Sequence, residues 1–204
     1  MVEANSSHVE IRRLWPSDKE AFGDHLLRLD PRSRHLRFGG GMSDDFLVHY
    51  AEKCFGTGDL VYGVFVDGGM VGAAELRSDQ VIWSEQAPFG RKIHAEAAFS
   101  VEEAYRRRGI GEKLFKRILR AATNHGVETI EIVCLPDNIA MQNLAKKFKT
   151  HFTFEENELT GRLTARRPTA FSLMREASGD ALDFGAAFFD AQWRAVARPK
   201  REGA

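Results

Sequence analysis

The stretch Arg106-Arg107-Arg108-Gly109-Ile110-Gly111 decides the fold, because it joins a predicted strand, 93–101, to a predicted amphipathic helix that starts at about Gly109. A helix N-terminus presents unpaired N–H groups and the positive end of the helix dipole, which together bind anions. Glycines let an anion come close, and arginines supply forked donors that suit phosphate oxygens. The sequence therefore predicts a pyrophosphate-binding turn. The alternative is a solvated basic turn before an ordinary helix, since short glycine patterns recur by chance.

Strand and helix patterns surround this turn on both sides. Asp67-Gly68-Gly69 is a strong hairpin signal, because glycine accepts the positive φ of tight turns, and Asp30-Pro31 is predicted to end the first helix. The pattern predicts strands at 8–14, 59–66, 70–76, 93–101, 129–135, 152–155 and 159–165, and helices at 16–29, from Ser43, at 109–125, from Asn138 and at 181–196. This order predicts an α/β fold with a mixed, mainly antiparallel twisted sheet and flanking helices.

The chain is expected to divide into one domain, residues 1–165, and a C-terminal helical extension, residues 166–204, because the composition changes from Arg166 onward. A length of 204 residues with 43% hydrophobic residues suits one compact domain with such an extension. The apolar residues of the extension include Phe184, Ala187, Phe188 and Trp193. This face is expected to pack on the domain or on a second subunit, which leaves a homo-oligomer open.

The composition argues against several classes of function. The 29 basic residues balance the 29 acidic ones, so no nucleic-acid partner is expected. We find no export signal and no run of about 18 apolar residues, so no membrane anchor is expected. Cys54 and Cys134 stand alone and the histidines form no HExxH pattern, so neither a disulfide framework nor a metal site is predicted. We expect a cytoplasmic protein.

The spacing RxxGxG separates the turn from two other phosphate-binding motifs, GxxxxGK[ST] and GxGxxG. It resembles the acetyl-CoA signature of the GNAT superfamily of acetyltransferases, and the matching residues are Arg106, Gly109 and Gly111. The resemblance covers most of residues 8–165 and includes AEAAFSV before the turn and IEIVCLPDN after it. It implies the GNAT fold and acetyl-CoA as cosubstrate, with no metal.

The resemblance also implies how acetyl-CoA is held. The strand before the turn is expected to part from its neighbour, so that backbone groups of Phe99, Ser100 and Val101 pair with the pantetheine arm and supply an oxyanion donor. The turn from Arg106 to Gly111 would surround the pyrophosphate. Asn138 is expected to bond the same arm, and its alternative role is to cap a helix.

Glu96 is the predicted catalytic base. Acetyl transfer to an amine needs a neutral nucleophile, and a lysine with a pKa of about 10.4 is almost wholly protonated at neutral pH. Strand alternation places Glu96 on one face with His94, Ala98 and Ser100. Because alanines flank it in a central strand, we expect partial loss of solvent to make the carboxylate a better base. In the resembling family a glutamate at this place is the base. The alternatives are a surface or ion-paired Glu96, with Glu102 or Glu103 as the base.

Within the superfamily the chain is most similar to bacterial protein lysine acetyltransferases that modify acyl-CoA synthetases. The likeness is carried by Ser33-Arg34-His35-Leu36-Arg37-Phe38, Ala95-Glu96 and Pro136-Asp137-Asn138. It implies N-acetylation of a protein lysine, with a protein such as an acyl-CoA synthetase as partner. The alternatives are acetylation of a small amine, and a non-catalytic acetyl-CoA sensor whose C-terminal helix mediates assembly.

Two features of the sequence leave roles open. Ala145 stands where many superfamily members carry a tyrosine that protonates the leaving thiolate, so this step is unassigned. Arg32, Arg34 and Arg37 form a local basic cluster. The cluster could hold a CoA phosphate or guide an acidic acceptor, and a solvated arginine face is an equal alternative.

Overall fold

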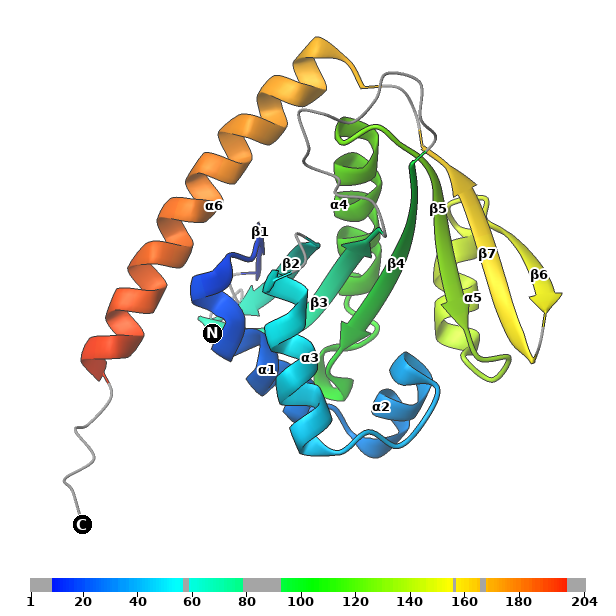
Figure 1. The fold of residues 1–204 in the computed structure, drawn as a ribbon, viewed down its shortest axis with the longest axis horizontal. Helices are drawn as coiled ribbons and strands as arrows, with labels where there is room; N and C mark the ends of the chain where they lie inside the picture. The colour runs from blue at the N-terminus through cyan, green and yellow to red at the C-terminus, as the bar shows by residue number, and fades with distance from the viewer. Residues whose placement is uncertain (1–8, 57–58, 79–92, 156, 166–167, 198–204) are drawn as a thin grey trace, which may run out of the picture.

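A single twisted sheet of seven strands forms the centre of the protein, in the order β1-β2-β3-β4-β5-β7-β6 (Figure 1). The computed structural model describes residues 9–56, 59–78, 93–155, 157–165 and 168–197. The strands are β1 Val9–Arg13, β2 Leu60–Val66, β3 Gly69–Arg77, β4 Ile93–Val101, β5 Val127–Cys134, β6 His151–Glu155 and β7 Glu158–Thr164. Every neighbouring pair is antiparallel except β4 and β5, which confirms the predicted mixed, mainly antiparallel sheet.

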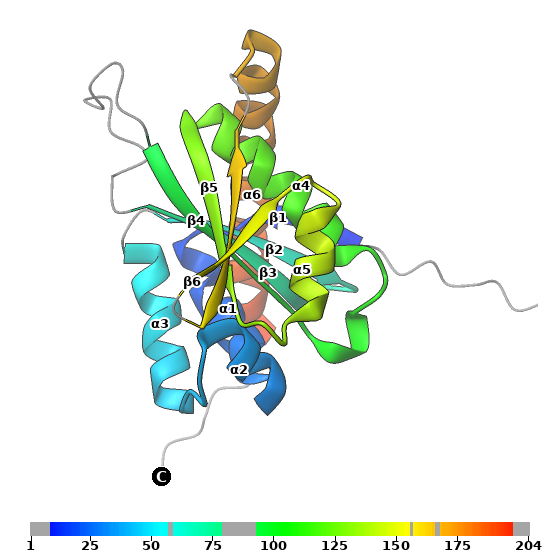
Figure 2. The ribbon, with the colours of Figure 1, turned by 90° about the vertical axis from the view of Figure 1, so that its right-hand side faces the viewer.

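Helices cover both faces of the sheet. They are α1 Lys19–Leu27, α2 Pro31–Phe38, α3 Asp44–Gly56, α4 Ile110–Asn124, α5 Ile139–Lys146 and α6 Ala170–Ala197, with short 3-10 turns at Pro16–Asp18 and Glu103–Tyr105. Figure 2 shows α4 and α5 on one side of the sheet and α1, α2 and α3 on the other. Each side has its own apolar core, because alternate residues of the strands point to opposite faces. No helix in the described chain has the length and apolar character needed to cross a membrane.

The first helix ends before Asp30-Pro31, as predicted, but the sequence pattern does not predict helix α2, which begins at Pro31. The Asp30 carboxylate accepts a hydrogen bond from the Ser33 backbone N–H at 3.0 Å and thereby caps the new helix. Proline is well suited to the first helical position, where a backbone N–H has no intrahelical partner. The helix ends at Gly39, whose φ of 75° is the left-handed conformation typical of a C-terminal glycine.

Strands β4 and β5 pair over a short distance only. Their parallel ladder starts at Ile93, shifts register before His94 and ends where Glu96 lies opposite Glu131. The antiparallel ladder between β4 and β3 continues as far as Val101. The second half of β4 therefore has a strand neighbour on one edge and none on the other in the described chain, as the resemblance to the GNAT superfamily implies.

Three stacked rings support β4 where it leaves β5. Phe99 of β4 lies parallel to Phe115 of α4, with ring centroids 5.2 Å apart, and Phe115 stacks on Phe148 beyond α5 at 4.1 Å. Apolar contact and ring stacking both stabilise such an arrangement, the stacking by about 1 kcal/mol per pair. The stack ties the opened strand to α4 and to the end of α5.

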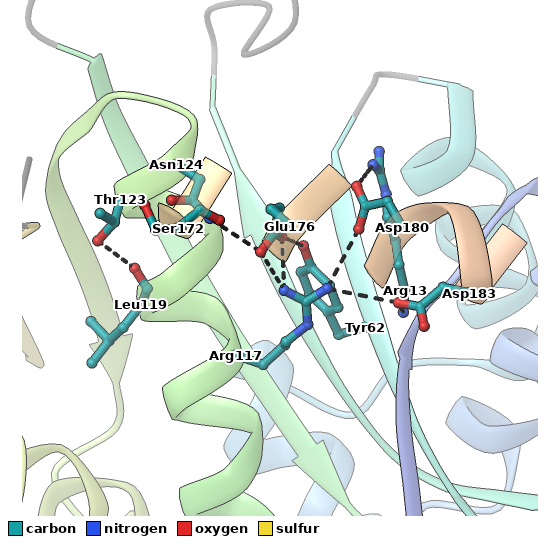
Figure 3. A network of polar contacts seen from close by, with 10 residues as sticks. All are labelled: Arg13, Tyr62, Arg117, Leu119, Thr123, Asn124, Ser172, Glu176, Asp180 and Asp183. Atoms are coloured by element: carbon teal, nitrogen blue, oxygen red, sulfur yellow. Dashed lines mark hydrogen bonds and ion pairs between the residues drawn. The ribbon is translucent and has the colours of Figure 1, made fainter. Parts of the chain in front are cut away.

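The C-terminal helix α6 is longer than predicted. It begins at Ala170 instead of 181 and includes Ser178-Gly179-Asp180, which lie before the predicted start. Ion pairs with the domain hold this part of the helix in place (Figure 3). Arg117 of α4 contacts Glu176 at 2.7 Å, and Arg13 of β1 contacts Asp180 at 2.6 Å.

Further contacts extend this attachment along α6. The buried guanidinium of Arg12 bonds Asp18 at 2.8 Å and reaches Asp190 at 3.0 Å. Glu176 is also bonded by the Tyr62 hydroxyl and by the side-chain amide of Asn124. Side by side with β1 and α4 in Figure 1, α6 thus packs on the domain through an acidic face.

Candidate active site

The turn before α4 leaves the start of the helix open to an anion. Gly109 is the N-cap with φ of 78°, and no side chain caps the first turn. Ile110 is buried in the core, so that only its backbone can face a ligand. A Cβ on Gly111 would lie 3.2 Å from Leu144 Cδ2, which gives this glycine a packing role between α4 and α5. The predicted pyrophosphate site therefore has its backbone donors in place.

The three arginines of the turn differ in their surroundings. Arg106 donates from Nε to the Val101 carbonyl at 3.1 Å, and its guanidinium also bonds the Ser33 hydroxyl and lies 3.4 Å from Asp30. Arg106 therefore ties the turn to α2. Arg107 and Arg108 are exposed, with Arg108 over the ring of Tyr105 at 5.3 Å. These two side chains carry the charge that is most accessible to phosphate groups.

The residues predicted to pair with the pantetheine arm lie in the part of β4 that no longer pairs with β5. Phe99 and Val101 are partly buried, and Ser100 is buried. Asn138 caps α5, because its side-chain oxygen accepts from the Met141 backbone N–H at 3.1 Å. The capping alternative for Asn138 is thus correct, and its contact with a pantetheine arm stays a prediction.

Glu96 is exposed on the sheet face that also carries α1, α2 and α3. The expectation that flanking alanines remove solvent from it is wrong, because Ala95 and Ala97 point to the opposite face and pack in the other core. Its cross-strand neighbours are Arg77 on β3 and Glu131 on β5. An accessible carboxylate at the point where two strands part can meet an incoming amine.

A buried carboxylate that sequence reasoning missed lies beside this position. Glu75 is 1% exposed and sits opposite Ala98 of β4, two residues from Glu96. Arg37 donates to Glu75 at 2.7 Å, and the Tyr50 hydroxyl donates to it at 2.5 Å. Burial alone would raise the pKa of Glu75, but Arg37 and the Tyr50 hydrogen bond outweigh burial and hold this pKa below its usual value.

These contacts correct the prediction of a free arginine cluster. Arg37 is committed to Glu75 and Tyr50, and Arg34 donates to the carbonyls of Leu27 and Leu29 as well as to Asp44. Arg32 alone of the three is exposed. Arg34 and Arg37 therefore hold α2 against its neighbours, and neither is available to steer a partner.

A second missed group links α1 to the end of β4. His25 is fully buried, with Nδ1 3.0 Å from a Glu102 carboxylate oxygen and Nε2 2.9 Å from the Ser100 hydroxyl. An ionised carboxylate only accepts hydrogen bonds, so Nδ1 of neutral His25 donates to Glu102 and Nε2 accepts from Ser100. The Ser100 hydroxyl is enclosed, which makes this group a positioning device for β4. Glu102 also contacts Arg28 at 2.9 Å, which makes it a poor alternative base.

A comparison with protein families identifies the class of protein. The model of the acetyltransferase (GNAT) family matches residues 24–149, which is more than half of the chain. The protein belongs to this family, and it is an acetyl-CoA-dependent N-acetyltransferase. The described residues contain no group of three or more His, Cys, Asp or Glu side chains that could hold a metal ion.

Solved structures with the same fold include several bacterial proteins. The GNAT domain of S. lividans PAT has a TM-score of 0.63 at 17% identity, over 80% of this chain and 99% of that chain. The protein yncA from Salmonella typhimurium, solved with its cofactor acetyl-CoA, has a TM-score of 0.55 at 16% identity, over 79% and 96%. A cAMP-binding acyltransferase from Mycobacterium smegmatis has a TM-score of 0.53 at 18% identity, over 88% of this chain and 52% of that chain. These likenesses show the shared GNAT fold.

Replacing Gly109 with valine should weaken CoA binding about tenfold or more, which corresponds to about 1.4 kcal/mol. The reason is that a β-branched residue cannot easily adopt φ of 78° and would add bulk where the anion approaches. Isothermal titration calorimetry with CoA measures the effect. The matched control is Gly126→Val, because Gly126 has φ of 69° at the far end of α4. Equal CoA affinity in the two variants would place the pyrophosphate elsewhere.

The His25 group should make the protein less stable in acid. Burial lowers the pKa of His25 more than the Glu102 carboxylate raises it, so the folded state resists protonation. A lowered folded-state pKa contributes stability that is present above the unfolded pKa of about 6.5 and is lost as the pH falls below it. Urea unfolding at pH 7 and pH 5 should show this loss. It should shrink in His25→Gln and persist in the control His49→Gln, since His49 is exposed. An unchanged loss in His25→Gln would contradict the assignment.

Proposed function

We propose that acetyl-CoA binds along the opened edge of β4 and that Glu96 removes a proton from a lysine of an acceptor protein. The pyrophosphate would lie over the first turn of α4, near Gly109 and the exposed Arg107 and Arg108. The pantetheine arm would pair with backbone groups of residues 99–101. In the described chain the β4–β5 ladder ends before these residues. These backbone positions fit the cosubstrate, because an extended amide chain needs donors and acceptors along an edge.

Glu96 would act on the amine before the new bond forms. The neutral nitrogen would attack the thioester carbon, and a backbone N–H of residues 99–101 would stabilise the oxygen that becomes negative. The nitrogen of the intermediate loses its second proton to solvent and the C–S bond breaks. The CoA thiolate then takes a proton from solvent, since the position at Ala145 has no hydroxyl. Acetylation of a lysine removes its positive charge, which would silence an acceptor that uses this lysine.

The position of Glu96 on an open part of the sheet is the observation that favours a protein acceptor. On this face the neighbouring strands present further exposed side chains, namely His94, Val133, Arg162 and Thr164. A surface of exposed side chains suits a lysine on a folded partner, whereas small substrates are usually enclosed in a concave pocket. The resemblance at Ser33-Arg34-His35-Leu36-Arg37-Phe38 supports the same acceptor class. An acyl-CoA synthetase is the proposed partner.

Glu96→Gln should lower turnover by roughly 10²- to 10⁴-fold while CoA affinity is unchanged, because only proton removal is lost. The loss should become smaller at high pH, where more of the acceptor amine is already neutral. Initial rates of CoA release between pH 7 and pH 10 measure the loss of turnover and its dependence on pH. Glu103→Gln is the control, since Glu103 is also exposed but lies past the end of β4. Normal turnover in Glu96→Gln with a loss in Glu103→Gln would move the base to Glu103.

The acceptor class can be tested with labelled acetyl-CoA. The protein is incubated with a purified AMP-forming acyl-CoA synthetase, or with a panel of polyamines, amino sugars and aminoglycosides. Label should appear on a synthetase lysine at a far higher kcat/KM than on any small amine, and Glu96→Gln should abolish it. Efficient labelling of a small amine, with none on the synthetase or on any lysate protein, would refute the protein acceptor and leave the acetyltransferase assignment intact.

A further inference from the structure

Helix α6 packs on the domain through its polar face and exposes its apolar face, which is the reverse of the usual arrangement. Most residues that face the domain are acidic or small, namely Glu176, Asp180, Asp183, Ala187 and Asp190. The exception is Phe184, whose ring packs edge-on against Trp15 with centroids 5.3 Å apart. The residues that face away are large and apolar: Phe171 is 74% exposed, Met174 67%, Leu182 75%, Phe189 72% and Trp193 77%. At about 100° per residue these five fall within roughly one quarter of the helix circumference. A continuous apolar stripe of this kind marks a binding surface.

The stripe reads nearly the same in both directions. Successive positions are Phe171, Met174, Ser178, Leu182, Gly185, Phe189 and Trp193, so two large residues at each end flank a small, a large and a small one in the middle. Two such helices placed antiparallel bring Phe171 opposite Trp193 and Met174 opposite Phe189, while Leu182 lies on the two-fold axis. Large side chains at both ends and small ones beside the axis allow the helices to approach closely at their centre.

From this pattern we infer that α6 pairs with α6 of a second copy of the chain, antiparallel and centred on Leu182. A two-fold interface brings the same surface together from both copies, so that each residue meets its counterpart twice, and a near-palindromic stripe places side chains of similar size opposite each other in such a pair. The inference does not depend on the acceptor, because α6 packs on β1 and α4 and not on the strands that carry Glu96.

Charge argues against a membrane as the occupant of this surface. Helices that lie on bilayers usually carry Lys or Arg on the polar face, opposite the apolar one. In α6 the polar face carries Glu176, Asp180, Asp183 and Asp190, and these carboxylates are held by arginines of the domain. The sector that holds the stripe contains one charged residue, the exposed Arg175, and its other residues are uncharged. A mainly apolar surface beside an acidic face fits another copy of itself better than an anionic lipid surface.

The apolar area is of the size that a stable dimer uses. Phe171, Phe189 and Trp193 together expose on the order of 450 Å² per copy, if each aromatic side chain has its usual area. Met174 and Leu182 bring the total close to the about 800 Å² per partner of a standard interface. The 28 residues of α6 form a rod about 42 Å long, which is long enough to present this whole area to one partner.

The oligomeric state of the full chain tests the inference. Multi-angle light scattering at about 50 μM should show a dimer, and Leu182→Glu or Phe189→Glu should give monomers with unchanged circular dichroism and acetyl-CoA affinity. Phe154→Glu is the matched control, because Phe154 is also 63% exposed but lies on β6. This control should remain dimeric. A monomeric native chain, or a dimer that survives both α6 substitutions, would overturn the proposal.

Cysteine cross-linking tests the orientation, and the native Cys54 and Cys134 are both buried. Under oxidation Leu182→Cys should cross-link to itself, and a mixture of Phe171→Cys with Trp193→Cys should give the mixed disulfide. Phe171→Cys that preferentially cross-links to itself would instead show a parallel pair and overturn the antiparallel register. Co-sedimentation with vesicles of anionic lipid, lost in Leu182→Glu and accompanied by a monomer in solution, would assign the stripe to a membrane.

Discussion

The short parallel contact between β4 and β5 is the constraint on which the rest of the structure depends. Once the strands part after Glu96, the backbone of residues 99–101 has a strand partner on one edge only in the described chain. Phe115 supports the opened strand from one face, and His25 holds it from the other through Ser100. Because α4 begins where this edge ends, a ligand with a polar arm and a terminal pyrophosphate matches both features at once.

Local patterns predict most of the fold, because hairpin glycines, strand alternation and the glycine turn are short-range signals. The same patterns miss α2, since Pro31 is read as a stop, although proline at a first helical position begins a helix when Asp30 caps it. They also start the C-terminal helix at 181, after Gly179, although α6 begins at Ala170. Around Gly179 the helix is held by ion pairs with residues far away in sequence, which outweigh the low helix propensity of glycine.

The candidate site is predictable only in part for a similar reason. A strand pattern locates Glu96 and a spacing locates the turn, but the partners of Glu75 and Glu102 lie 38 and 77 positions away, where no periodic signal exists. The carboxylates around the site have different partners as a result. Glu75, Glu102 and Glu131 each contact a cationic side chain, whereas no ion pair to Glu96 is recorded within the described chain.

The contact between Arg12 and Asp190 has a consequence for how the protein is made. Arg12 emerges from the ribosome 178 residues before Asp190, which at usual synthesis rates of about 5–20 residues per second is a delay of roughly 10 to 35 seconds. During this delay the guanidinium already has Asp18, six positions away, as a partner. Arg117 can meet Glu176, Asp180 and Asp183 only after residues 176–183 of α6 have been synthesised. The Arg12–Asp18 ion pair can therefore form early in synthesis. The charge of Arg117 on α4 is compensated only after α6 has been made.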